Sequence, residues 1–120
     1  KMQKKINILI ISGYFLPGYK HGGIQKSIIN TIDNLRMHFT FKVLTRNHDI
    51  GEKLIPYKNI KLDKWNIINN IKVRYLSNNQ CSLFNYLNVI RSINFDIIHL
   101  NSFFEPLSVY IIFGKWMGLI

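Results

Sequence analysis

The stretch KINILIISGYFLPGYKHGGIQKSIINTIDNL, residues 5–35, decides the fold of this chain. Its near-continuous apolar run, Ile6–Ser12, is typical of a strand buried on both faces of a parallel sheet. A loop containing glycines and a proline follows, and the apolar residues after it recur at helical spacing, which predicts an amphipathic helix. Those residues are Ile24, Ile28, Ile32 and Leu35. The loop therefore leads from a buried strand into a helix.

The rest of the chain continues this alternation of strands and helices. Strands are predicted over 40–46, on either side of Asn69-Asn70 and over 95–101, with a helix over 82–93. Asparagine tolerates positive φ, so we expect a tight hairpin at the Asn pair. The run 95–101, FDIIHLN, reads as a second buried parallel strand, and Pro106 suits the first turn of a last helix. This order predicts an α/β domain with a Rossmann-like, doubly wound, mostly parallel sheet.

The predicted sheet also predicts where a ligand binds. In open α/β sheets, ligands lie beyond the carboxyl ends of the strands. Two loops leave such ends, Gly13–Gly23 after the first strand and Asn101–Glu105 after the late strand. If those two strands are neighbours, we expect the loops to face each other across one crevice.

The glycines of the first loop fail two phosphate-binding motifs. A P-loop needs glycine directly before Lys-Ser, and here Gln25 precedes Lys26-Ser27. No three glycines have the dinucleotide spacing G-x-G-x-x-G. What remains is Gly22-Gly23 at the start of the helix, where free N–H groups and the helix dipole favour an anion. A role in turning the chain is the alternative reading of the pair.

The sequence does not predict a metal site or a catalytic site from the spacing of its residues. Lys20, His21 and Lys26 add positive charge near the glycine pair, although such side chains are more often simply solvated. His99 lies within an apolar run, so a core histidine is expected there. The four histidines lack metal-ligand spacing, no pair of carboxylates suggests acid–base catalysis, and no serine sits on a nucleophile elbow. Cys81 is the one cysteine, which excludes an internal disulfide and suits a reducing compartment.

Charge and hydropathy restrict the partners without choosing one. Sixteen Lys and Arg against six Asp and Glu give a net charge of +10, which favours nucleic acid, a phospholipid surface or nucleotide phosphate. The 120 residues correspond to one domain or part of one. The apolar run that begins at Pro106 is interrupted by Lys115 and falls short of the roughly 18 residues of a spanning helix, so a buried or interfacial helix is expected.

Taken together, these segments resemble a known family. The stretch 5–35, with its apolar strand, Pro-containing loop and Gly22-Gly23-Ile24-Gln25, resembles the opening of retaining GT-B glycosyltransferases of family four. TFKVLTRNHD, DKWNIINNIKVRYLS and FDIIHLNSFF are similar to the second strand, the hairpin and the late strand of the same domain. The likeness covers nearly the whole chain in the right order. It implies the incomplete N-terminal half of a GT-B architecture, with the donor-binding domain absent from these 120 residues.

The resemblance also implies roles for individual residues. Gly22 and Gly23 would bind the donor diphosphate through backbone N–H groups, with Gln25, His21 and Lys26 on the acceptor or sugar side. Asn101 and Ser102 would line the acceptor side of the cleft. No catalytic residue, metal or cofactor is expected in this segment, and mechanism would rest on positioning and leaving-group stabilisation. The partners implied are a nucleotide-sugar and a saccharide or glycolipid acceptor.

Two other classes of function stay open at this point. A non-catalytic nucleotide- or nucleic-acid-binding module is the main alternative, although no helix-turn-helix, RNA-recognition or zinc pattern is present, so nucleic acid is not expected. An oxidoreductase half-domain is disfavoured by the missing dinucleotide fingerprint. The expected location is the cytoplasm, with peripheral contact to an anionic membrane at its inner face. The chain by itself is expected to transfer no sugar.

Overall fold

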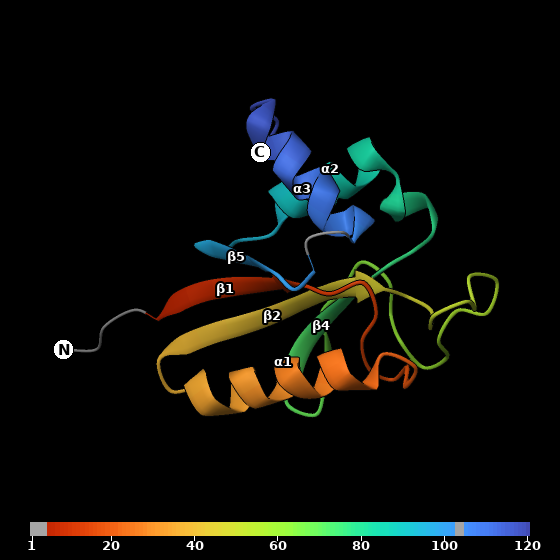
Figure 1. Ribbon diagram of the computed structural model, residues 1–120, viewed down its shortest axis with the longest axis vertical. Coiled ribbons are helices and arrows are strands. Elements are labelled where there is room, and N and C mark those ends of the chain that lie inside the picture. The colour runs from red at the N-terminus through yellow and green to blue at the C-terminus, as the bar shows by residue number, and fades with distance from the viewer. Residues whose placement is uncertain (1–4, 103–104) are drawn as a thin grey trace.

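The computed structural model describes residues 5–102 and 105–120. Its elements, in chain order, are β1 (Ile6–Ile11), α1 (Gly22–Leu35), β2 (Phe39–Arg46), β3 (Asn66–Ile68), β4 (Ile71–Leu76), the short 3₁₀ turn η1 (Asn79–Cys81), α2 (Leu83–Ser92), β5 (Ile97–Leu100) and α3 (Pro106–Trp116). Figure 1 shows this succession. The strands and helices expected from the sequence are all present, and Pro106 occupies the first turn of α3 as predicted.

The strands form one sheet in the order β3-β4-β2-β1-β5. The neighbours β1–β2, β1–β5 and β2–β4 are parallel, and only the hairpin β3–β4 is antiparallel. Asn69 and Asn70 connect that hairpin with φ angles of 50° and 64°, which confirms the predicted tight turn. The fold is thus α/β with a five-stranded, mostly parallel sheet and three helices, an arrangement compatible with a Rossmann-like fold.

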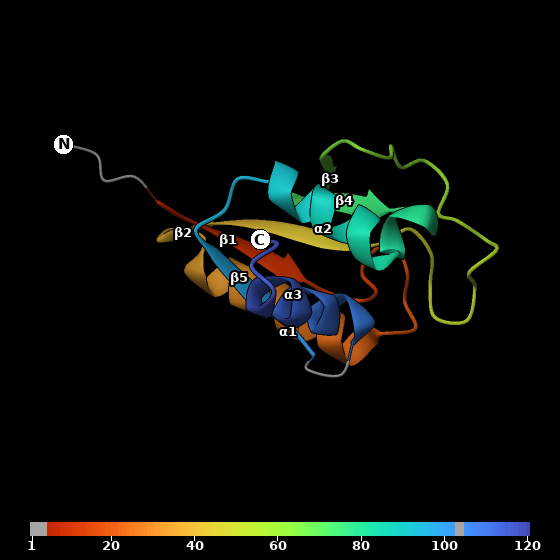
Figure 2. The same ribbon diagram turned by 90° about the horizontal axis from the view of Figure 1, so that it is seen from above.

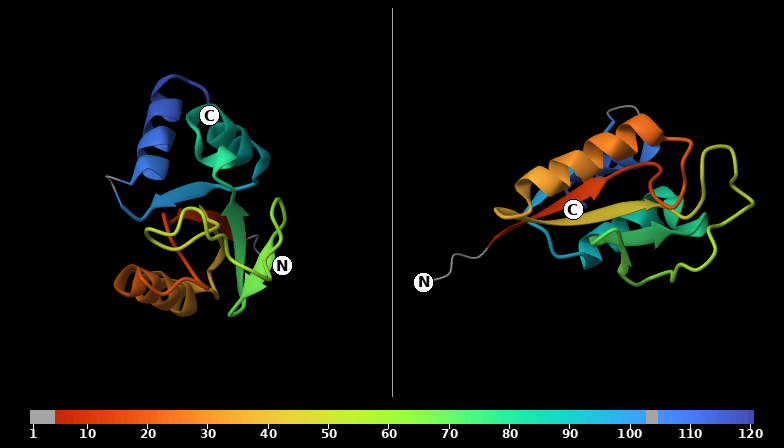
Figure 3. Two further views of the ribbon diagram at one scale, coloured as in Figure 1. Left: turned by 90° about the vertical axis from the view of Figure 1, so that its right-hand side faces the viewer. Right: turned by 90° about the horizontal axis from the view of Figure 1, so that it is seen from below.

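Helices cover both faces of the sheet, as Figures 1 and 3 show. On one face, Ile28 and Ile32 of α1 pack against strand residues such as Val43 and Tyr75. On the other face, α2 and α3 pack over β1 and β2, and Tyr86 is among the fully buried side chains there. Each face therefore has its own hydrophobic core, and this holds the carboxyl ends of the strands in fixed positions.

The last strand differs from its prediction as a buried strand. β5 lies at the edge of the sheet with β1 as its one strand partner among the described residues. Ile98 packs into the core under α3, but Ile97 is 47% exposed and His99 is exposed as well. These two residues align with Ile8 and Ile10, which face α1, yet α1 does not extend far enough to cover β5. The prediction that His99 is a core histidine is therefore wrong.

The described helices are too short, or not apolar enough, for any of them to cross a membrane. α3 is the most apolar of the three, and it buries Leu107 and Ile111 against α2 and the sheet. Its other side leaves Trp116 79% exposed. This agrees with the expected buried or interfacial helix.

Candidate functional site

β1 and β5 form the point of the sheet where the direction of chain winding reverses. From β1 the chain crosses through α1 to β2 on one side, whereas β5 lies on the other side of β1. Loops that leave the carboxyl ends of two such strands diverge and leave a crevice between them. The expected neighbourhood of the loops at Gly13–Gly23 and Asn101–Glu105 is confirmed by the β1–β5 pairing. Phe103 and Phe104 of the second loop lie outside the described residues.

A pocket of about 270 Å³ occupies this crevice, and we call it the switch-point pocket. It is lined by Gly13, Tyr14, His21, Ile50, Asn101, Ser102, Glu105 and Pro106. Three residues that the sequence singled out, His21, Asn101 and Ser102, come together here from two distant loops. Tyr14 and Glu105 were not predicted as site residues.

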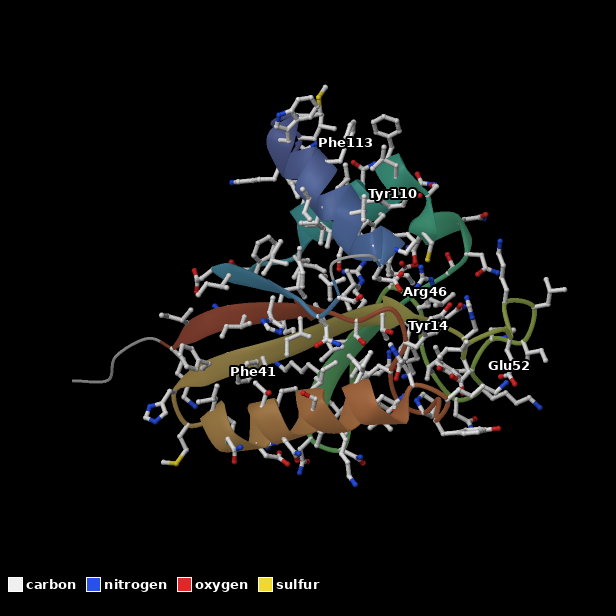
Figure 4. All side chains as sticks on the ribbon, viewed as in Figure 1. Tyr14, Phe41, Arg46, Glu52, Tyr110 and Phe113 are labelled. Carbon is white, nitrogen blue, oxygen red and sulfur yellow. The ribbon has the colours of Figure 1, made fainter. Side chains whose placement is uncertain are left out.

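One lining residue of the pocket, Glu105, forms an ion pair with Arg46. Arg46 Nη2, at the end of β2, lies 2.5 Å from Glu105 Oε1, just before α3, and both side chains are largely buried. The guanidinium also lies 5.0 Å from the centre of the Tyr14 ring (Figure 4) and donates a hydrogen bond to the Gly13 carbonyl. Desolvation lowers the pKa of Arg46, but the contact with the Glu105 carboxylate and its charge outweigh this and raise it. The cation therefore stays fully charged beneath the pocket.

The Glu105 carboxylate is held by Arg46. Oε1 is buried and lies against the guanidinium, which balances its charge. Glu105 nevertheless lines the pocket, and a carboxylate has several lone pairs. It can therefore also accept a hydrogen bond from a ligand hydroxyl.

Gly13 is needed because the ion pair passes directly over it. A Cβ atom at this position would lie 2.4 Å from Glu105 Oε2 and 2.9 Å from Arg46 Nη1. Any side chain would therefore push the pair apart. The sequence places both residues at the edge of the sheet where ligands bind. Arg46 ends one predicted strand, and Glu105 follows the predicted strand at 95–101.

His21 occupies the N-cap position of α1 at the border of the pocket. Its ring packs edge-on against Tyr14, with 5.8 Å between ring centres. Its Nδ1 atom is buried and has no hydrogen-bond partner among the described residues. A buried polar atom without a partner is costly, so this nitrogen is suited to a ligand group.

Gly22 and Gly23 lie beside the pocket rather than inside it. They border an open depression on α1 together with Gln25, Lys26 and Ile29. No side chain of the described residues caps the helix, and its first turn carries no acidic residue. A Cβ at either glycine would meet nothing within 4 Å. Packing therefore does not require these glycines, whereas close approach of a ligand to the helix N-terminus would.

Gln25 has a structural contact that the sequence did not reveal. Only 5% of it is exposed, and its Nε2 donates a 2.7 Å hydrogen bond to the Gly18 carbonyl. The side chain thus ties the start of α1 to the preceding loop. Lys26, one residue later, is exposed and has no partner of opposite charge among residues 5–102 and 105–120.

The loop before α1 is held in place by buried polar contacts. Asp49 accepts hydrogen bonds from the backbone N–H groups of Tyr19, Lys20 and Ile50 at 2.9–3.3 Å. Desolvation raises the pKa of Asp49, but these bonds outweigh it and lower the pKa below its usual value. The hydroxyl of Tyr57 donates to the Phe15 carbonyl on the same loop. The pocket wall is therefore preformed.

The pocket presents several polar groups among apolar lining residues. An imidazole, an amide, a hydroxyl and a carboxylate converge around it, so it can donate and accept several hydrogen bonds at once. Within the part of the chain that the structure describes, no three His, Cys, Asp or Glu residues cluster as metal ligands. Such a set of groups fits a hydroxyl-rich ligand. Comparison of the chain with protein-family models, curated proteins and solved structures found no match.

Proposed function

We propose that this chain is the acceptor-side domain of a retaining, GT-B-type glycosyltransferase. The complete enzyme would transfer a sugar from a nucleotide-sugar to a polysaccharide or glycolipid acceptor. The donor would be held mainly by a second domain outside these 120 residues. By itself the chain is expected to be inactive.

The observation that carries this proposal is the switch-point pocket. The resemblance assigns Asn101 and Ser102 to the acceptor side of the cleft and His21 to the acceptor or sugar side. All three line one polar pocket, although they come from loops far apart in the sequence. The Nδ1 atom of His21, which has no hydrogen-bond partner among the described residues, and the Glu105 carboxylate suit the hydroxyls of a saccharide.

In this proposal the chain contributes positioning and electrostatic stabilisation. The N–H groups at Gly22 and Gly23 would hold the donor diphosphate as its charge grows during departure, helped by the α1 dipole. Lys26 lies one helical turn further along the same face and would add a positive charge. The pocket would orient the acceptor hydroxyl toward the sugar. No covalent protein nucleophile from this segment takes part.

The test is a substitution in the complete enzyme, assayed with a panel of nucleotide-sugars. Gly23→Leu places a bulky side chain at the diphosphate site but meets nothing within 4 Å at its Cβ, so the fold is spared. We expect turnover to fall by about 100-fold or more, because a misplaced substrate reacts more slowly by about this factor. Asn34→Leu, at an exposed position of the same helix, is the matched control and should retain activity.

Two results would contradict the proposal. One is unchanged turnover in Gly23→Leu, which would show that the donor diphosphate does not bind at this site. The other is tight, salt-sensitive binding of oligonucleotides with no effect of nucleotide-sugars, which would favour the nucleic-acid-binding module instead.

A further inference from the structure

The connection between β2 and β3, residues 47–65, is unusually long for a segment without a helix or strand of its own. Figures 1 and 2 show it projecting beyond the carboxyl edge of the sheet, on the side of the switch-point pocket. Irregular loops longer than about 12–15 residues are uncommon in compact domains and usually serve a function. Ile50, within this connection, lines the pocket itself.

The tip of this connection exposes aliphatic side chains. Leu54 is 90% exposed and Ile55 is 62% exposed, and Leu62 further along is 42% exposed. Tyr19, on the loop before α1, is 75% exposed. Its backbone N–H donates a hydrogen bond to Asp49, which belongs to the connection. Leu54 and Ile55 are adjacent in the chain, and adjoining side chains as exposed as these indicate an interaction surface.

The exposed tip is nevertheless firmly anchored. Tyr57 and Ile60 pack into the core on the α1 side, so the chain turns inward directly after Ile55. At the base, Asn78 Nδ2 donates to the Lys53 carbonyl at 3.0 Å, and Gln80 Nε2 donates to Asp63 at 2.6 Å. Both arms of the loop are therefore fastened beside η1. The aliphatic side chains point outward from a built structure.

The same connection carries an excess of positive charge. Lys53, Lys58, Lys61 and Lys64 are exposed. The carboxylates nearby are engaged elsewhere, because Glu52 pairs with Lys20 at 3.0 Å and Asp63 accepts from Gln80. None of the four lysines has a carboxylate within ion-pair distance among the described residues. A lysine-rich rim thus accompanies the aliphatic tip.

We propose that this surface docks the protein on an anionic lipid bilayer. The docking surface consists of Tyr19, Leu54, Ile55 and Leu62 with Lys53, Lys58, Lys61 and Lys64. Aliphatic residues insert at the boundary of headgroups and acyl chains, a tyrosine suits the interface, and lysines are attracted to anionic headgroups. Nucleic acid is a poorer fit, because bases stack on aromatic rings, whereas Tyr19 is the one aromatic residue among the eight of this surface.

Docking would bring the switch-point pocket near the membrane. The pocket shares Ile50 with the connection, and Lys20, on the loop before α1, is joined to the connection through Glu52. The inference stands on the exposed and charged residues alone and does not depend on the proposed sugar transfer. Vesicle binding therefore tests it independently.

The experiment measures co-sedimentation of the protein with two kinds of vesicle. One is phosphatidylcholine alone, and the other contains phosphatidylglycerol as about one third of its lipid, which makes the surface strongly negative. We expect binding to the anionic vesicles only, and we expect it to weaken as salt is raised. Replacing all four lysines with glutamine should lower the partition coefficient by about 20-fold or more, since each contributes up to about fivefold. Leu54→Ser with Ile55→Ser should lower it several-fold.

A matched control uses exposed residues outside the docking surface. Ile67 is as exposed as Ile55, and Lys72 and Lys115 are exposed lysines elsewhere, so Ile67→Ser with Lys72→Gln and Lys115→Gln should leave binding unchanged. Circular dichroism confirms that each variant is folded. The proposal is overturned by equal binding to both vesicles, by salt-insensitive binding, or by an equal loss in the control. Absence of binding to anionic vesicles also overturns it and would favour a protein partner for this surface.

Discussion

Arg46 and Glu105 form an ion pair across the end of β1, with 2.5 Å between Nη2 and Oε1. Arg46 ends β2 and Glu105 precedes α3, so the pair joins a strand of the sheet to the start of a helix. Gly13 lies beneath it without a side chain. The shape of the switch-point pocket therefore depends on three residues from three separate parts of the chain.

Breaking this pair should destabilise the fold. Glu105→Gln leaves the buried guanidinium without a countercharge, and the expected loss is about 2 kcal/mol, below the range for fully buried pairs because both side chains keep some exposure. Urea unfolding measures it. Lys20→Gln, which removes an exposed pair with Glu52, is the control and should cost less than about 0.5 kcal/mol. Similar losses in both variants would mean that Arg46 and Glu105 are not specially coupled.

The glycines of the first loop should respond differently to the same substitution. Gly13→Ala forces a Cβ against Glu105 Oε2 and should destabilise the protein by about 1–3 kcal/mol. Gly22→Ala meets no atom within 4 Å and should be neutral or stabilise α1 by up to about 1 kcal/mol. Thermal unfolding of the two variants compares them directly. A destabilised Gly22→Ala would show that the fold, and not a ligand, requires that glycine.

Asp49 should make the loop before α1 sensitive to acid. Its pKa is lower in the folded protein than in the unfolded chain, so its contribution is fully present above about pH 4 and is lost as the pH falls through the folded-state pKa. We expect the urea midpoint to fall below pH 4 in the unmodified protein. Asp49→Asn should flatten that fall and cost about 1–2 kcal/mol at pH 7. Identical pH profiles for the two proteins would contradict this role.

Gln25 should act mainly through the loop. Gln25→Ala leaves the Gly18 carbonyl without its partner, and a loss of about 1–2 kcal/mol in unfolding free energy is expected. Lys26→Ala, the exposed neighbour, should change stability by less than about 0.5 kcal/mol. Amide hydrogen exchange should also quicken around Gly18 in Gln25→Ala. Unchanged stability and exchange would mean that the hydrogen bond from Gln25 to Gly18 does not stabilise the loop, and that Gln25 serves only to contact a ligand.

The sequence predicted the elements well because local patterns determine them. The apolar run at 6–12 is buried from Leu9 onward, although Ile6 is 43% exposed. The helical spacing of Ile28 and Ile32 reflects burial that the structure confirms. Asn69-Asn70 specified its turn through the positive φ that asparagine tolerates. Neighbouring loops at the ligand edge followed from the topology of parallel sheets.

What the sequence could not show depends on contacts between distant residues. FDIIHLN has the composition of a central strand, but its place at the edge of the sheet exposes Ile97 and His99. Composition does not report the order of strands. The Arg46–Glu105 pair needs two chain segments to meet above Gly13, and the burial of Gln25 depends on the path of the loop.

We propose that the switch-point pocket and the adjoining start of α1 bind a nucleotide-sugar and a saccharide. An NMR titration of backbone amides with nucleotide-sugars and with simple saccharides measures this binding residue by residue. We expect weak, saturable shifts with dissociation constants in the millimolar range, about 4 kcal/mol of binding energy, because most donor contacts would lie in another domain. The shifts should fall on Gly13, His21, Gly22, Gly23 and Asn101 and spare the hairpin turn at Asn69-Asn70. No shifts at about 10 mM ligand, or shifts confined to other surfaces, would contradict it.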